Sequence, residues 1–224
     1  MKKNYSEITV VLDRSGSMES CAQDVIGGFN SFLEEQQAAP GEARISLFQF
    51  DDRYESVYEG RDVRDAPRLT GESFRPRGRT ALFDAVGLTI ASMDTRHAHL
   101  ADEAKPEKVF FIIITDGQEN CSVEYGFAQL TEMIRVRQDE RGWQFVFLGA
   151  SLEAVDTAVD IGIRKGGTMH YVHDKDGYEA LYWSMSKNVS RMRDAKFKSA
   201  DMGKHDFFDQ EDIGKQEDIR KKKR

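Results

Sequence analysis

Ile8-Thr9-Val10-Val11-Leu12-Asp13-Arg14-Ser15-Gly16-Ser17 joins an apolar run to a series of side chains that carry oxygen. The apolar run predicts a buried strand. Asp13, Ser15 and Ser17 follow it at alternate positions, so an extended main chain would point all three to the same side. The stretch therefore predicts a strand that delivers three oxygen ligands at its carboxyl end.

Two later positions carry the same kind of side chain. Asp116 follows a second apolar run at 109–115, and Thr80 follows Gly78 and opens a helical pattern. Two carboxylates and three hydroxyls are hard ligands of the kind that Mg²⁺ prefers. Each residue alone also has a structural explanation, since Ser17 and Thr80 suit helix N-caps and Asp116 suits a turn. Together the five residues predict a site for a divalent metal ion.

Composition and charge restrict the class of protein. The chain has 224 residues, of which 39% are hydrophobic and 32% charged, which suits one globular domain with a substantial core. Its net charge of −7 argues against a nucleic-acid binder that neutralises phosphates. The run at 109–115 is far shorter than the ~20 residues of a membrane helix, and the first residues lack the apolar segment of a signal peptide. We therefore expect a cytoplasmic protein that acts without a membrane.

Apolar runs alternate with helical patterns along the chain, which predicts an α/β fold with a mainly parallel sheet. The expected strands lie at 8–12, 43–50, 54–59, 108–115, 144–150 and 168–173. The expected helices lie at 18–38, 80–94, 124–141, 152–161 and 177–194. Only three residues separate the second strand from the third, so we expect a hairpin and an antiparallel edge strand. Residues 195–224 are charged with little periodicity, and we expect a flexible tail beside a domain at 1–194.

The order of the elements bears on the metal site. In an open parallel sheet, ligands collect at the carboxyl ends of the strands, where the strand order reverses. Asp13 and Asp116 both follow such ends. If their two strands are neighbours, the two carboxylates face each other across this crevice.

Three motifs resemble those of von Willebrand factor type A domains. Val11 to Met18, Val-Leu-Asp-Arg-Ser-Gly-Ser-Met, resembles the Asp-x-Ser-x-Ser signature of that family. Gly78 to Ala85 resembles its threonine loop, and Ile114 to Asn120 resembles its second acidic motif. The order of the motifs also fits, and the likeness spans about residues 5–194. The chain is most similar to small stand-alone bacterial or phage-type members.

This resemblance implies a Rossmann-like open sheet of six strands in the order 3-2-1-4-5-6, with strand 3 antiparallel and helices on both faces. It also implies a metal-ion-dependent adhesion site that holds Mg²⁺ or Mn²⁺. Ser15, Ser17 and Thr80 would be direct ligands; Asp13 would bind through water, and Asp116 through water or directly. A carboxylate of a partner protein would fill the last position, so the family implies a protein-binding module rather than an enzyme.

Four arginines extend this prediction to the partner. Arg75, Arg77 and Arg79 alternate in the loop before Thr80, and Arg14 lies inside the first motif. On an acidic body they could surround the metal with positive charge that favours an acidic partner. The alternative is a solvated loop, or arginines paired with acidic neighbours, namely Glu72 and Asp84.

Other functions and sites have weaker support. A Mg²⁺-dependent phosphatase-like enzyme is the main alternative, but a haloacid-dehalogenase-like site would want a second acid where the chain has Ser15. His97 and His99 have no sulfur or second histidine pair nearby, so we expect a surface helix end or loop rather than zinc. Cys21 and Cys121 are expected to be reduced, although both follow metal-site segments and a bond between them stays open.

Overall fold

The structure is a computed structural model that describes residues 1–196 and 199–223. In these residues six strands form one sheet in the order β3-β2-β1-β4-β5-β6. Neighbouring strands are parallel except for β2 and β3, which form the expected antiparallel hairpin. The predicted α/β class, strand order and antiparallel third strand are confirmed. The strands are β1 (Lys2–Asp13), β2 (Glu42–Phe50), β3 (Tyr54–Asp62), β4 (Pro106–Thr115), β5 (Gln144–Gly149) and β6 (Thr168–His170).

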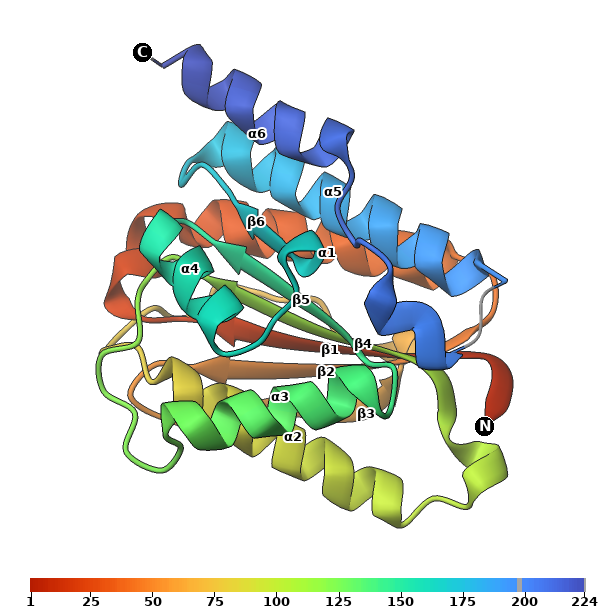
Figure 1. Cartoon of the computed structure of the whole chain (residues 1–224). Helices are drawn as coiled ribbons and strands as arrows, with labels where there is room; N and C mark the ends of the chain where they lie inside the picture. The colour runs from red at the N-terminus through yellow and green to blue at the C-terminus, as the bar shows by residue number, and fades with distance from the viewer. Residues whose placement is uncertain (197–198, 224) are drawn as a thin grey trace.

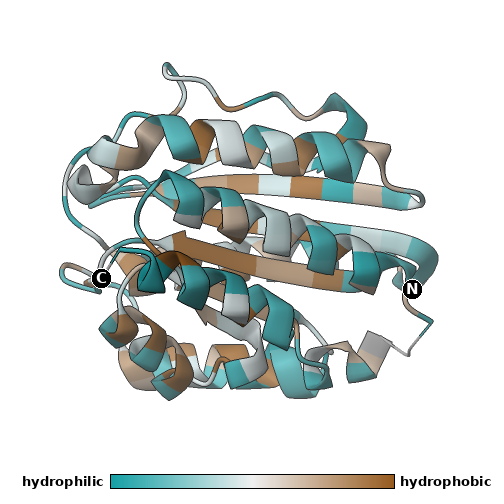
Figure 2. Ribbon diagram, turned by 90° about the horizontal axis from the view of Figure 1, so that it is seen from above, coloured by the Kyte–Doolittle hydropathy of each residue, from teal (hydrophilic) through white to brown (hydrophobic). Residues whose placement is uncertain are grey.

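Helices cover both faces of the sheet (Figure 1). One core cluster packs α1 and α5 against the sheet, and a second packs α2, α3 and α4 against the opposite face. Figure 2 shows hydrophobic strands in the middle layer between helices that carry hydrophilic residues. The helices are α1 (Ala22–Ala38), α2 (Leu82–Ala98), α3 (Phe127–Asp139), α4 (Leu152–Asp160), α5 (Lys175–Asp194) and α6 (Gln210–Lys221). Short 3₁₀ turns lie at η1 (Gly16–Cys21), η2 (Val63–Asp65), η3 (Asp102–Ala104), η4 (Lys165–Gly167) and η5 (Ser199–Lys204).

The two central strands explain the positions of the motifs. β1 and β4 are neighbours in register, with Leu12 opposite Ile114. Both strands are buried on both faces from residue 8 onward in β1 and from residue 108 onward in β4, as their continuous apolar runs require. Because both strands run in the same direction, Asp13 and Asp116 emerge at one edge of the sheet.

Several boundaries differ from those predicted. β1 begins at Lys2, because its polar start still pairs with Pro106 of β4. The segment 16–21 forms the 3₁₀ turn η1 rather than the start of α1. β6 ends at His170. α3 begins only at Phe127, because the loop before it is held by hydrogen bonds to Asp84 of α2 and to Glu119 of the loop itself. Local propensity does not show where such tertiary contacts end a helix or a strand.

The last helix of the described chain was not predicted. α6 packs on the outer side of α5 rather than on the sheet (Figure 1). Its buried residues are polar: Asp212 accepts a hydrogen bond from Asn188 (2.7 Å), and Gln216 accepts one from the main-chain N–H of Val172 (2.9 Å). Residues 210–221, to which the sequence pattern assigned no element, therefore form a helix.

The C-terminal end of α5 is fixed by a buried lysine. Lys108 of β4 is 4% exposed, and its Nζ donates to the carbonyl oxygens of Met192 (2.8 Å), Arg193 (2.7 Å) and Ala195 (2.7 Å). These carbonyls lie at the end of the helix, where a cation is favoured by the helix dipole. None of the helices in the described part of the chain combines the length and the apolar character needed to cross a membrane.

Candidate metal site

Asp13 is held in a fixed orientation at the end of β1. Its Oδ2 accepts a hydrogen bond from the hydroxyl of Thr115 (2.5 Å), and its Oδ1 accepts one from the main-chain N–H of Ser15 (2.6 Å). The Ser15 bond turns the chain out of the strand in the manner of an Asx-turn. Asp13 is fully buried, so both bonds lie away from bulk water.

A chain of hydroxyls joins the first motif to Asp116. The Ser15 and Ser17 hydroxyl oxygens are 3.1 Å apart, and Ser17 Oγ donates to Asp116 Oδ1 at 2.8 Å. Ser17 lies in η1, where the 3₁₀ turn directs its side chain back toward the end of β4. The expected convergence of β1 and β4 at this edge is therefore present in the side chains.

Thr80 reaches the same place through its loop. The loop is bound to the first motif by main-chain bonds from Gly16 N to Gly78 O (3.2 Å) and from Arg77 N to Arg14 O (2.8 Å). Gly78 has φ +68°, a conformation that favours glycine. A Cβ built on Gly117 would lie 3.1 Å from Thr80 Oγ1 and 3.9 Å from Asp13 Oδ2, so the main chain at Gly117 approaches both side chains closely.

The two carboxylates are withdrawn from water and have no lysine or arginine partner among the described residues. The side chain of Asp116 is 3% exposed and that of Asp13 is fully buried. Burial and, to a smaller extent, the charge of Asp116 raise the pKa of Asp13 to about 7, while the hydrogen bonds from Thr115 and Ser15 lower it. Burial also raises the pKa of Asp116, while the hydrogen bond from Ser17 lowers it. Among the described residues, no lysine or arginine forms an ion pair with either carboxylate.

This donor set fits a divalent metal ion. Two carboxylates would gain from a positive charge, and three hydroxyls can supply further oxygen atoms without adding negative charge. No group of three or more His, Cys, Asp or Glu side chains suited to a metal occurs in the described chain. A cation at this edge would therefore depend on hydroxyl oxygens from Ser15, Ser17 and Thr80, and such an all-oxygen set suits Mg²⁺ or Mn²⁺ better than Zn²⁺.

The four arginines of the sequence prediction, Arg14, Arg75, Arg77 and Arg79, fall into two groups. Arg14 Nε (2.9 Å) and Arg77 Nε (2.8 Å) both donate to Oδ2 of the buried Asp51, and Arg14 also pairs with Glu55 (2.6 Å). Their acidic partners are therefore Asp51 and Glu55 rather than Glu72 and Asp84. Despite burial, hydrogen bonds from Arg77 and Arg53 and the charge of Arg14 hold the pKa of Asp51 below its usual value.

Arg75 and Arg79 differ from this pair. Both are exposed, and neither forms an ion pair within the part of the chain that the structure describes. The prediction that arginines attract an acidic partner therefore rests on these two residues. Arg14 and Arg77 instead hold the first motif and the Thr80 loop together through one shared carboxylate.

Sequence reasoning missed the residues that support the site. Thr115 orients Asp13, and its signal is a hydroxyl at the end of an otherwise apolar strand, directly before Asp116. Asn120 holds Thr80 from both sides, accepting from Thr80 N at 3.0 Å and donating from its own N–H to Thr80 O at 3.1 Å. His173 Nε2 lies 3.4 Å from Asp116 Oδ2, and no local pattern indicates this contact.

His97 and Cys21, considered above for zinc and for a disulfide, are both buried in the structure. His97 is buried on Glu7 (2.6 Å) rather than at a surface helix end, because α2 runs to Ala98 and its last turn faces β1. Cys21 and Cys121 are both free thiols; Cys21 is buried, with its sulfur 3.1 Å from the hydroxyl of Tyr178. The predicted reduced state agrees with this arrangement.

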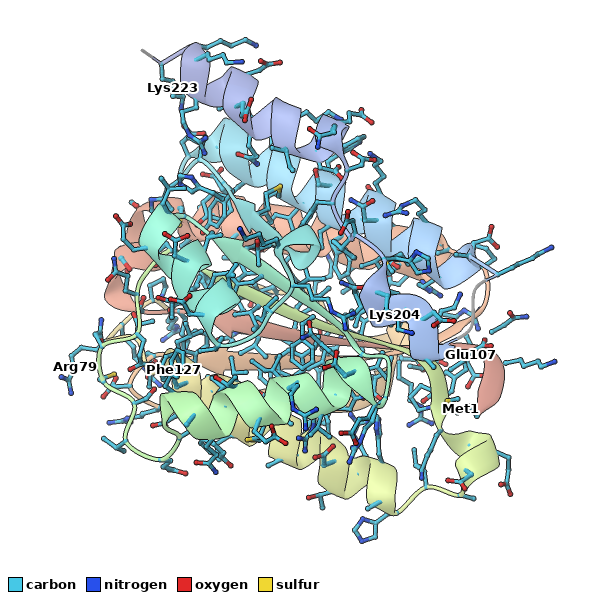
Figure 3. All side chains as sticks on the ribbon, viewed as in Figure 1. Met1, Arg79, Glu107, Phe127, Lys204 and Lys223 are labelled. Atoms are coloured by element: carbon cyan, nitrogen blue, oxygen red, sulfur yellow. The ribbon has the colours of Figure 1, made fainter. Side chains whose placement is uncertain are left out.

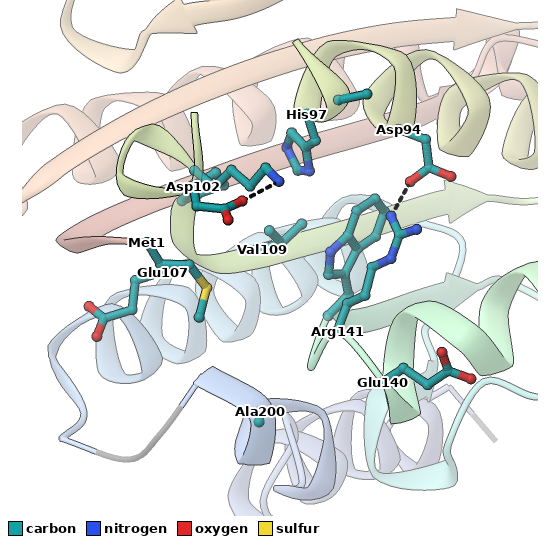
Figure 4. A pocket seen from close by; sticks show the side chains of 13 residues that line it. Met1, Asp94, His97, Asp102, Glu107, Val109, Glu140, Arg141 and Ala200 are labelled. Carbon is teal, nitrogen blue, oxygen red and sulfur yellow. Dashed lines mark hydrogen bonds and ion pairs between the residues drawn. The ribbon is translucent and has the colours of Figure 1, made fainter. Parts of the chain in front are cut away.

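A pocket of about 890 Å³ lies at the opposite edge of the sheet, near the starts of β4 and β5 (Figure 4). Its lining includes His97, Val109 and Trp143. Two of its acidic side chains are paired, Asp102 with Lys105 at 2.7 Å and Asp94 with Arg141 at 2.6 Å. Neither Asp13 nor Asp116 lines this pocket, so it is separate from the candidate metal site.

Comparison with solved structures identifies the architecture. A von Willebrand factor type A protein from Catenulispora acidiphila superposes with a TM-score of 0.54 at 14% identity, over 84% of this chain and 43% of that chain. The chain has the fold of a von Willebrand factor type A domain. No protein-family model and no curated protein matches the sequence. At this identity the likeness concerns the fold alone.

Two further solved structures are similar to this fold. The pilus adhesin SpaC from Lactobacillus rhamnosus GG is similar with a TM-score of 0.62 at 16% identity, over 85% of this chain and 30% of that one. Proximal thread matrix protein 1 from the mussel byssus, described with a zinc-occupied MIDAS motif, has a TM-score of 0.57 at 14% identity, over 85% and 47%. The chain spans less than half the length of each of these three proteins.

Proposed function

We propose that the chain is a metal-dependent protein-binding module of the von Willebrand factor type A family. Its cation would be held by Asp13, Ser15, Ser17, Thr80 and Asp116. One observation carries the proposal: two carboxylates withdrawn from water, with no lysine or arginine partner in the described chain, share an edge of the sheet with three hydroxyls. A cation there would compensate both charges.

The residues have separate roles in this proposal. Ser15, Ser17 and Thr80 bind the ion through their hydroxyl oxygens, and Asp13 and Asp116 supply charge, through water or, for Asp116, directly. The bound ion would provide one open coordination position for a carboxylate of a partner protein. Mg²⁺ or Mn²⁺ is the proposed ion because every donor is an oxygen. Because proximal thread matrix protein 1 has a zinc-occupied site, the affinity for Zn²⁺ should be compared with that for Mg²⁺ and Mn²⁺.

Metal binding is tested by thermal unfolding of the whole chain with Mg²⁺, Mn²⁺ or Zn²⁺. At a free metal concentration of about 100 times Kd, binding adds about 2.7 kcal/mol, which raises the Tm of a chain of this size by about 5–11 °C. Ser15→Ala with Ser17→Ala should remove the shift. A shift of the same size in the double variant would place the ion elsewhere.

Partner binding is tested by affinity capture from the native host in Mg²⁺, in chelator, and with the same double variant. A protein lost in both controls supports the proposal, whereas partners that are indifferent to metal contradict it. Purified chain should also be assayed with a generic phosphoester. Turnover that Asp13→Asn abolishes would favour the phosphatase-like alternative. A cytoplasmic location stays a prediction from the sequence.

A further inference from the structure

Exposed apolar side chains lie at the same edge of the sheet as the candidate metal site. Val123 is 89% exposed, Phe127 48% and Leu152 60%; these three residues are called the apolar rim below. Val123 lies in the loop that follows Asp116, Phe127 opens α3, and Leu152 opens α4 directly after β5. Single exposed apolar residues need no explanation, but several around one polar site indicate an interaction surface.

The loop that presents Val123 is held rigidly. The carboxylate of Asp84 accepts hydrogen bonds of 2.8 Å from the main-chain N–H groups of Val123, Glu124 and Tyr125. Glu119 Oε1 accepts from Cys121 N (2.8 Å) and from the next N–H (2.7 Å). Val123 is therefore exposed on a fixed loop, and a partner that covers it loses little conformational entropy to loop ordering.

The same loop is joined to the metal site. Asn120 makes hydrogen bonds with both the main-chain N–H and the carbonyl of Thr80, and Glu119 Oε2 accepts from Phe83 N at 2.8 Å. The rings of Phe83 and Phe127 then pack at 6.5 Å between centroids. Val123 and Phe127 thus occupy fixed positions relative to Thr80, and Ala150, two residues before Leu152, donates to the carbonyl of Thr115 (3.1 Å).

Positive charge at this edge of the sheet favours a partner with acidic residues. Arg79, next to Thr80, is exposed and forms no ion pair with any described residue, and the same is true of Arg75. Figure 3 shows Arg79 and Phe127 at the same end of the molecule, away from Met1 and Glu107. Arg79 directly precedes Thr80, whose main-chain N–H and carbonyl are both bonded to Asn120 in the loop that carries Val123.

We propose that the partner presents an acidic residue together with an apolar side chain a few residues away. The acidic residue binds at the metal site, and the apolar side chain packs on the apolar rim. Further acidic residues of the partner lie near Arg79 and Arg75. This inference rests on the proposed function, because it adds a second contact to the same binding event.

The test is a selection from a library of random displayed peptides on the immobilised whole chain in Mg²⁺, with bound peptides eluted by EDTA. The expected peptides share one aspartate or glutamate and an apolar residue at a recurring distance from it. A synthetic peptide of the consensus should bind Val123→Ser with Phe127→Ser about tenfold more weakly. Ile213→Ser, an exposed apolar residue on α6, is the matched control and should bind unchanged.

The outcomes separate this inference from the proposed function. The inference is overturned, and the proposed function is not, if the eluted peptides share an acidic residue but no apolar residue. The same holds if the consensus peptide binds wild type and Val123→Ser with Phe127→Ser equally well. Peptides that bind equally well to Ser15→Ala with Ser17→Ala, or the recovery of no EDTA-eluted peptide, overturn both. Circular dichroism of each variant establishes that it is folded. Val123, Phe127 and Ile213 are exposed, so replacing them should leave the fold intact.

Discussion

The hydroxyl of Thr115 donates a hydrogen bond of 2.5 Å to Oδ2 of Asp13, across the β1–β4 pair. Both residues are fully buried. The same hydroxyl accepts a hydrogen bond of 3.2 Å from Gly117 N, so one side chain fixes both the carboxylate and the turn that follows Asp116. Thr115 is therefore a positioning residue for the candidate metal site.

Thr115→Val should weaken divalent-metal binding by about 10- to 100-fold, because the variant keeps the shape but loses the hydrogen bond that orients Asp13. Thr115→Ser keeps the hydroxyl and should retain most of the affinity. Calorimetric titration with Mg²⁺ and Mn²⁺ measures both. Equal affinity for wild type and Thr115→Val would show that other contacts orient Asp13.

The buried Glu7 should make stability depend on pH. Burial alone would raise the pKa of Glu7, but the hydrogen bonds and charges of His97 and Arg96 outweigh it, so the pKa lies below 4.5. The folded chain therefore binds this proton less readily than the unfolded chain. The stabilisation is complete above pH 4.5 and is lost as the pH falls through the lower pKa of the folded state.

Glu7→Gln removes this titration. At about pH 7 it should lower the free energy of unfolding by about 3 kcal/mol, because Arg96 loses its buried partner. The gap to wild type should narrow toward about pH 3, as measured by urea unfolding. Glu103→Gln, at an exposed position, serves as the control. A gap that stays constant with pH would contradict the prediction.

Two adjacent glycines of α1 should respond in opposite directions to alanine. A Cβ at Gly27 would meet no atom within 4 Å, whereas one at Gly28 would lie 2.0 Å from the ring of Tyr182 on α5. Gly27→Ala should stabilise by about 0.5–1 kcal/mol through helix propensity. Gly28→Ala should destabilise by about 1–3 kcal/mol by overpacking. Denaturant unfolding compares them, and equal effects would mean that α1 and α5 are not in close contact.

The attachment of α6 depends on Asp212. Its Oδ2 accepts hydrogen bonds from Asn188 (2.7 Å) and from Asp209 N (2.9 Å), and the residue is fully buried. Asp212→Ala should destabilise by about 1–3 kcal/mol, since two buried donors lose their acceptor. Limited proteolysis before residue 210 should accelerate. Asp218→Ala, exposed on the same helix, should leave cleavage at the wild-type rate.

The sequence contains enough information for the sheet but not for every helix. β1 and β4 are apolar because both of their faces are buried, so composition alone indicates central strands. α6 buries Asp212 and Gln216 instead of apolar residues, and hydrophobic periodicity therefore has nothing to detect. Its available signals are the Asp209–Asp212 capping box and the Glu211–Lys215 pair at 2.9 Å.

The candidate site also has a part that the sequence predicts and a part that it does not. Asp13, Ser15 and Ser17 alternate along one extended segment, so their proximity follows from spacing. The support from Asp84 does not, because its carboxylate binds main-chain N–H groups 39 to 41 residues away. Contacts of this kind depend on tertiary structure. A pattern in a single sequence does not indicate which distant residue a side chain will contact.

Lys108 bears on whether α5 can move along its axis. A shift of α5 by one residue along its axis, about 1.5 Å, would separate the ammonium from the three carbonyls that it binds. Hydrogen bonds from a charged donor contribute about 1.5–3 kcal/mol each, so the loss of these three bonds opposes such a shift. Relaxation-dispersion NMR of α5 with and without metal would detect a displaced population. We therefore expect α5 to keep its position when a metal ion binds at the candidate site.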